Sequence, residues 1–222
     1  MTAPRTVLAF DFASPRASAA VARGGELVAA LERERGTSQR LLLPLLDEVL
    51  RSAGLEPAAI DGVVALRGPG SFTGLRVACA TALGFAQAHG AAATAVSSLE
   101  ALALSARESS GVVLAVVDAM RDEWFAQRWQ RGPALAADPL DAPRLVAAAP
   151  EVFDGVALVL GFGAERLAAA GGAAALPVRE PRNLATAAAR AASTGRWAWD
   201  ADRLTRPDYL RPPATTSAPA RG

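Results

Sequence analysis

The strongest constraint on the fold is a succession of strands and helices that occurs twice along the 222 residues. Residues 5–11 form an apolar run that ends in aspartate, and after the Ser109-Ser110-Gly111 break the run over 112–118 ends in the same way. Each half has the same order of elements: a strand, its hairpin partner, a helix, a strand and a helix. This duplication predicts an α/β protein with two lobes of similar plan.

The boundaries of these elements follow from apolar periodicity and from Gly, Pro and Ser signals. In the first half the expected strands cover 5–11, 17–23, 26–35, 61–66 and 92–96, and the expected helices cover 38–53, 75–89 and 99–106. In the second half the expected strands cover 112–118, 124–130 and 156–160, and the expected helices cover 144–149, 164–170 and 184–192. Residues 132–143 are expected to form a loop that could include a short strand.

The predicted domains are a first lobe over residues 1–108 and a second, smaller lobe over 109–211. The helix at 184–192 and the chain after it could return to the first lobe. Residues 212–222 are rich in proline and small polar residues, which is typical of a disordered tail.

The composition excludes several kinds of protein. The chain is 51% apolar with a net charge of +1, so it can bury a large core but has no overall field to attract nucleic acid. A single cysteine fits a reducing compartment, and neither a membrane-spanning run nor a signal-peptide pattern is present. We therefore expect a cytoplasmic protein that is not in a membrane.

The missing residue types are equally informative. The sequence contains no lysine, one histidine (His89) and one cysteine (Cys79). A Schiff-base or phosphate-loop lysine is therefore impossible, and a zinc site of the His/Cys type lacks ligands. We expect this chain to carry no catalytic, cofactor-binding or metal-binding residues of its own.

A Gly-rich stretch over 68–76 joins an apolar strand to a helix, and it provides the expected structural motif: Gly68, Pro69, Gly70, Ser71, Thr73, Gly74 and Arg76. Either hydroxyl side chain can cap the helix. The order of strand, glycines and helix could hold an anion, but Leu75-Arg76 stands where a nucleotide-binding loop has Lys-Ser/Thr.

The helices over 38–53 and 75–89 are more apolar than surface helices usually are. Leucine and valine cover about 200° of the first helix, and small residues recur at i, i+4 along the second. Burial within the chain, for example under the C-terminal segment, would explain this composition, as would a docking face for a partner. The hypothetical interface comprises Leu42, Leu45, Leu46, Val49, Leu75, Ala80, Gly84 and Ala88.

Two alternatives stay open at this point. Asp11 and Asp118 end equivalent strands and could serve an ATP-dependent phosphotransferase of the sugar- or acetate-kinase type, although strand-end aspartates also close turns. Arg203, Arg206 and Arg211 around Tyr209 could bind RNA, or they could pin the C-terminal segment to the same chain.

The Gly68–Arg76 stretch resembles the signature of the TsaB (YeaZ) family, bacterial proteins of tRNA threonylcarbamoyladenosine synthesis. Supporting matches lie at 38–44, 118–123 and 207–211. The sequence departs from the family pattern in two places, where Phe12-Ala13 replaces Thr-Ser and Thr37 replaces histidine.

The resemblance implies an actin/hexokinase-like fold with two ribonuclease-H-like lobes. It also implies a non-catalytic subunit that docks on the catalytic threonylcarbamoyltransferase (TsaD), joined by an ATPase subunit (TsaE). When alone, such a protein could pair with itself. It would meet tRNA only indirectly, and ATP or ADP would enter only with the assembled complex.

Overall fold

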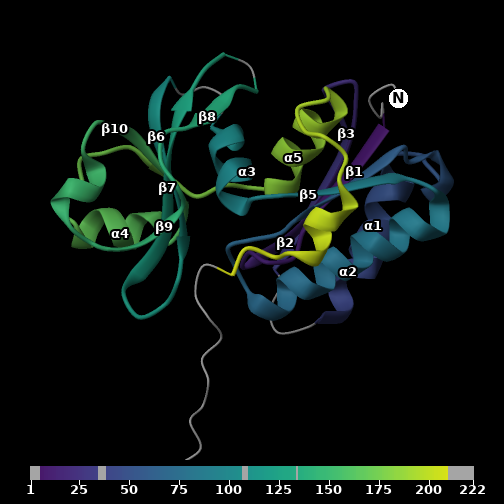
Figure 1. The fold of residues 1–222 in the computed structure, drawn as a ribbon, viewed down its shortest axis with the longest axis horizontal. Helices are drawn as coiled ribbons and strands as arrows, with labels where there is room; N and C mark the ends of the chain where they lie inside the picture. Colours follow the sequence, from purple (N-terminus) through teal and green to yellow (C-terminus); the bar gives the residue numbers. More distant parts are fainter. Residues whose placement is uncertain (1–5, 35–38, 107–109, 134, 210–222) are drawn as a thin grey trace, which may run out of the picture.

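The computed structural model describes residues 6–34, 39–106, 110–133 and 135–209, and it contains two β-sheets with helices between and outside them (Figure 1). The first sheet has the strand order β3-β2-β1-β4-β5. Its strands are β1 (Thr6–Asp11), β2 (Arg16–Arg23), β3 (Glu26–Glu34), β4 (Gly62–Leu66) and β5 (Ala92–Val96). The strands β1, β2 and β3 are antiparallel, whereas β1, β4 and β5 are parallel.

Strand β1 is buried over its whole length because helices cover both faces of the first sheet. Leu8 and Phe10 pack with α1 (Leu42–Ser52) and α2 (Phe72–His89) on the outer face. Val7 and Ala9 pack with α3 (Ser98–Ser105) and α5 (Leu184–Ser193), which lie between the two sheets (Figure 1). The side chains of one strand therefore alternate between two cores.

The second sheet repeats the plan of the first. Its strand order is β11-β10-β6-β7-β8, with β9 paired to another part of β7. Its elements are β6 (Gly111–Asp118), β7 (Glu123–Arg131), β8 (Ala137–Pro139), β9 (Arg144–Ala147), β10 (Val156–Phe162), β11 (Val178–Arg179) and the helix α4 (Ala164–Ala170). In both sheets a hairpin is followed by parallel strands on its other side. The prediction of a duplicated two-lobed α/β fold is confirmed.

The prediction of a helix over 144–149 is wrong. Residues Arg144–Ala147 form strand β9, in which Val146 lies opposite Trp124 of β7. Asp141, just before this strand, holds the chain against β7. Its carboxylate accepts hydrogen bonds from the backbone and side chain of Arg128 and from the side chain of Arg144. Residues 144–147 form backbone hydrogen bonds with the edge of β7. This pairing is more stable than an isolated helical turn of the same length would be. The expected loop over 132–143 contains the short strand β8, the alternative that the sequence left open.

The chain returns to the first lobe with α5 and stays there, and we call residues 194–209, which follow α5, the C-terminal strap (yellow in Figure 1). Its short 3-10 helix η4 (Ala201–Thr205) carries Leu204, which is buried in the core formed with α1 and α2. The indole of Trp199 lies directly over Gly62 of β4, where a Cβ would collide with it. The predicted disordered tail, 212–222, lies outside the described residues.

Candidate functional site

The Gly-rich motif is a packing junction between the start of α2 and the loop after β1. Ser71 caps α2 as predicted, because its hydroxyl accepts a hydrogen bond from the Gly74 amide at 3.3 Å. A Cβ on Gly74 would collide with the carbonyl oxygen of Phe12, and one on Gly70 would come within 2.8 Å of the Ala13 Cβ. These glycines therefore let the helix and the loop touch.

The C-terminal strap closes over the other side of the same motif. The Asp208 amide donates to the Arg67 carbonyl at 2.8 Å, and the Arg67 guanidinium lies 3.2 Å from the Asp208 carboxylate. Gly68 has a φ of +114°, and a Cβ there would come within 3.1 Å of the Asp208 carbonyl oxygen. Burial raises the pKa of Asp208, and the charges of Arg67 and Arg203 oppose this shift. The glycines of the motif therefore pack against other parts of the chain, whereas Thr73 and Arg76 are exposed.

The strap is held by an arginine of the first lobe. Arg67 also donates to the carbonyl of Arg206 at 3.2 Å. Of the arginines expected near Tyr209, Arg211 lies outside the described residues, and Arg206 contributes its backbone to this contact. The C-terminal strap is thus bound to the first lobe of the same chain. The arginine side chain that binds it is Arg67, just before the Gly-rich motif.

The two strand-end aspartates close their own loops. Asp11 is fully buried, and its Oδ1 accepts from the Ala13 amide at 2.8 Å. In the second lobe, Asp118 Oδ1 accepts from the Met120 amide at 2.7 Å and from Arg166 at 3.0 Å. Both carboxylates therefore act in turns, which is the structural alternative left open by the sequence.

Within the described ranges, no group of three His, Cys, Asp or Glu side chains is arranged to hold a metal ion. Across those same ranges, none of the helices combines the length and the apolar composition that a membrane span requires.

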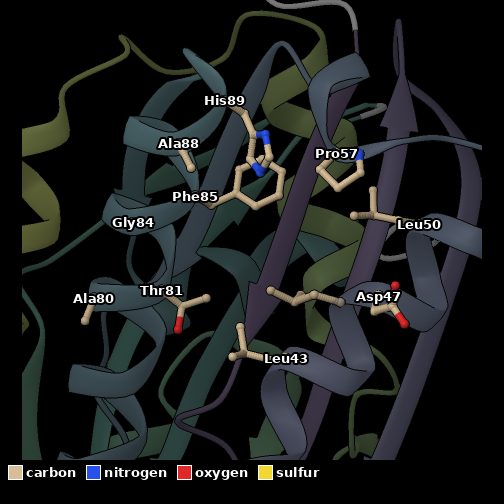
Figure 2. A pocket seen from close by; sticks show the side chains of 11 residues that line it. Leu43, Asp47, Leu50, Pro57, Ala80, Thr81, Gly84, Phe85, Ala88 and His89 are labelled. Carbon is tan, nitrogen blue, oxygen red and sulfur yellow. The ribbon is translucent and has the colours of Figure 1, made fainter.

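An apolar groove of about 580 Å³ lies between α1 and α2 on the outer face of the first lobe (Figure 2). Figure 2 shows Leu43, Asp47 and Leu50 of α1 on one side and the α2 residues on the other. The lining residues are Leu43, Leu46, Asp47, Leu50, Pro57, Ala80, Thr81, Gly84, Phe85, Ala88 and His89.

The predicted interface divides into an exposed and a buried part. Ala80, Gly84 and Ala88 are exposed along one row of α2. The other five predicted residues lie in the core of the first lobe and are at most 4% exposed: Leu42, Leu45, Leu46, Val49 and Leu75. Their assignment to a contact surface is corrected. The sheet covers the sector of α1 that carries the first four, and Leu75 of α2 packs against Gly68. Of the five, only Leu46 lines the groove.

Sequence reasoning missed two parts of the groove. Leu43 is 67% exposed, more than any other leucine described, and it stands at the rim. At the far end the rings of Phe85 and His89 are in contact, with their centroids 4.7 Å apart and their planes tilted by 52°. The apolar arc of α1 already contained Leu43, but the helical pattern alone could not tell which part of the arc the sheet covers.

No contact among the described residues requires glycine at position 84. The residue lies inside a helix with an ordinary helical φ, and a Cβ on it would meet none of the described atoms within 4 Å. A glycine inside a helix is destabilising by roughly 0.5–1 kcal/mol relative to alanine. Open space above Gly84, flanked by Ala80 and Ala88, allows another backbone to approach closely.

Comparisons with known proteins agree with this architecture. The family model described as TsaD, tRNA N6-adenosine threonylcarbamoyltransferase, matches residues 34–193. A solved protein from Pseudomonas aeruginosa, described as similar to peptidase YEAZ, superposes with a TM-score of 0.76 at 25% identity, covering 93% of this chain and 99% of that one. The likeness extends over both lobes.

Curated relatives indicate more specifically to which family the chain belongs. The tRNA threonylcarbamoyladenosine biosynthesis protein TsaB of Haemophilus influenzae is 34% identical over 125 residues, 55% of this chain and 53% of that protein. An uncharacterized Mycobacterium tuberculosis protein is 39% identical over 158 residues, 66% of this chain and 73% of its own length. The match thus spans about half the length of the first of these relatives. The chain belongs to the TsaB (YeaZ) family, which is related to the family of tRNA N6-adenosine threonylcarbamoyltransferases.

Proposed function

We propose that this protein is a non-catalytic scaffold subunit in the formation of tRNA threonylcarbamoyladenosine. The observation that carries the proposal is the exposed row of Ala80, Gly84 and Ala88 beside the apolar groove between α1 and α2. A helix of the catalytic threonylcarbamoyltransferase subunit, TsaD, would lie along this row and insert side chains into the groove.

The chemistry of the described residues supports a scaffold over a phosphotransferase. Asp11 is buried in its own turn, and Asp118 is bound to Arg166. The Gly-rich motif packs against the loop after β1 and against the strap, so its glycines already have a structural role. A protein with these features contributes by holding a partner in its active shape.

The remaining partners follow from the same proposal. An ATPase subunit, TsaE, would join the pair, and ATP or ADP would be bound only in that assembly. Transfer RNA would meet the complex through its catalytic subunit. In the absence of TsaD, the uncovered groove would pair with a second copy of this chain. All of these steps would take place in the cytoplasm.

Copurification with the TsaD encoded in the same genome tests the proposal. Gly84→Arg and Ala80→Glu place a large charged group on the row, where docking would bury it without a partner. Ala169→Glu is the matched control, since Ala169 is an exposed alanine on α4 of the second lobe. We expect the control to copurify with TsaD at the wild-type ratio and the two row variants to be lost from the complex.

The outcome that contradicts the proposal is equally definite. Normal copurification of both row variants would show that the row is not the docking surface. Tight Mg-ATP binding by the isolated wild-type chain, abolished in Asp118→Asn, would instead favour a phosphotransferase.

A further inference from the structure

We infer that Arg76 is a fixed cation at the end of the docking row, and that it selects a partner helix carrying a carboxylate in line with Ala80, Gly84 and Ala88. The inference rests on the proposed function and adds the chemistry of the partner surface. It is argued from the position of Arg76 on α2, from the two aromatic side chains that hold it, and from the absence of an ion pair to it among the described residues.

Arg76 belongs to the same row as the small residues. It precedes Ala80 by one helical turn, so Arg76, Ala80, Gly84 and Ala88 follow one another at i, i+4 and are all exposed. A helix lying along the row would pass three small side chains and then meet one guanidinium. The row is therefore apolar along most of its length and positively charged at one end.

Two aromatic residues restrain the guanidinium. Its carbon lies 4.0 Å from the centroid of the Phe72 ring, and its Nε donates a hydrogen bond to the Tyr209 hydroxyl at 3.2 Å. Tyr209 packs on Phe72 with the ring centroids 4.9 Å apart. Stacking and a hydrogen bond remove much of the rotamer freedom that an exposed arginine otherwise keeps.

The strap fixes Tyr209 in turn. The adjacent residue, Asp208, is anchored to Arg67 through its amide and through its carboxylate. The contact between Arg76 and Tyr209 thus joins the start of α2 to the last described part of the chain. Tyr209 is a positioning residue, because it would act on a partner only through Arg76.

Arg76 has no carboxylate partner within residues 6–34, 39–106, 110–133 and 135–209, whereas Arg67, Arg128 and Arg196 each form an ion pair there. In these ranges the single hydrogen bond of Arg76 uses Nε. Its two Nη groups therefore remain able to bind both oxygens of one carboxylate. Since a protein helix is the proposed occupant of the row, we assign this role to an Asp or Glu side chain.

The test measures the affinity of the full chain for TsaD at low and high salt. Arg76→Gln should weaken binding at least about tenfold and reduce the dependence on salt, because a hydrogen-bonded charge pair is lost. Arg76→Lys should recover only part of the loss, since lysine lacks the planar fork. Arg121→Gln, at an exposed arginine in the second-lobe hairpin, is the matched control and should bind as wild type does.

The substitution Tyr209→Phe tests whether Tyr209 acts by positioning the Arg76 guanidinium or by stabilising the fold. The variant keeps the aromatic packing on Phe72 and loses only the hydroxyl that accepts from Arg76. We expect an unchanged Tm and weaker binding. The substitution should have no further effect in the Arg76→Gln background, because positioning acts through the guanidinium.

Three results would overturn the inference. If Arg76→Gln bound TsaD with wild-type affinity, Arg76 would not recognise a carboxylate of the partner. If the substitution lowered the Tm as well as the affinity, Arg76 would have a structural role. If Arg76→Gln weakened binding of tRNA but left the protein pair intact, the cation would serve a phosphate. Absence of wild-type binding to TsaD would instead refute the proposed function.

Discussion

Gly74 and Gly84 both lie on α2, but the surroundings of the two residues differ. A Cβ on Gly74 would collide with the Phe12 carbonyl of the neighbouring loop, whereas one on Gly84 would enter open space. The first glycine is required for folding of the single chain. The second has no contact among the described residues that requires glycine, which agrees with the docking row of the proposed function.

The two alanine substitutions therefore have opposite expected effects. Gly74→Ala should lower the free energy of unfolding by about 3 kcal/mol, because backbone must move to admit the methyl group. Gly84→Ala should raise it by roughly 0.5–1 kcal/mol and should at the same time weaken TsaD binding. Denaturant unfolding and affinity measurements on both variants check this pair. Equal destabilisation by the two substitutions would contradict it.

Cys79 provides a second prediction at this scale. The side chain is 3% exposed, and burial raises the pKa of its thiol to about 11. The reactive thiolate is therefore scarce at neutral pH. We expect iodoacetamide to label the denatured chain quickly and the native chain very slowly, as followed by mass spectrometry. Rapid labelling under native conditions would mean that this part of α2 opens.

The β8–β9 connection gives a prediction at the scale of single elements. Although burial alone would raise the pKa of Asp141, the hydrogen bonds from Arg128 and Arg144 outweigh it and lower the pKa. The folded state thus favours the ionised carboxylate. Its contribution to stability is present above the unfolded pKa, near 3.8, and is lost as the pH falls through the lower folded value.

Asp141→Asn should consequently destabilise the protein at neutral pH and lose this effect in acid. The measurement is the difference in free energy of unfolding between wild type and variant as the pH is lowered to about 3. A difference that stays constant with pH would show that the carboxylate charge does not hold the edge of the second sheet.

Elements with a strong pattern could be predicted from sequence. The run Val63 to Leu66, the Ser71 cap and the small-residue helix after it have local causes, so the sequence alone identified them. Strand β9 could not be predicted, because its conformation depends on pairing with β7. For the same reason the sequence identified α1 and α2 as a candidate surface but misassigned Leu42 and Leu45, which the sheet buries.

On the scale of the whole molecule, the two lobes share a core. Buried residues of β1 and β6 belong to one cluster with α3 and α5, which fill the space between the sheets (Figure 1). Arg196, after α5, binds Glu100 of α3 at 3.1 Å and donates to the Leu135 carbonyl of the second lobe at 3.2 Å. In the opposite direction, Arg131 of β7 donates to the Ala106 carbonyl at 3.2 Å.

A shared core predicts that the lobes unfold together. Trp124 and Trp129 report on the second lobe, where both are buried, and Trp199 reports on the first through its contact with β4. Fluorescence of variants that retain one of these reporters should give the same denaturation midpoint as circular dichroism. Separate midpoints for the two lobes would contradict this expectation.

The return of α5 and the strap to the first lobe also bears on how the protein is made. The ribosome completes all five strands of the first sheet before it synthesises the second lobe, but α5 follows only afterwards. Until α5 emerges, part of the β1 face that carries Val7 and Ala9 stays open to water in the nascent chain. The core of the first lobe, which is translated first, is therefore completed only by α5. In the interval a chaperone or the second lobe must shield this face.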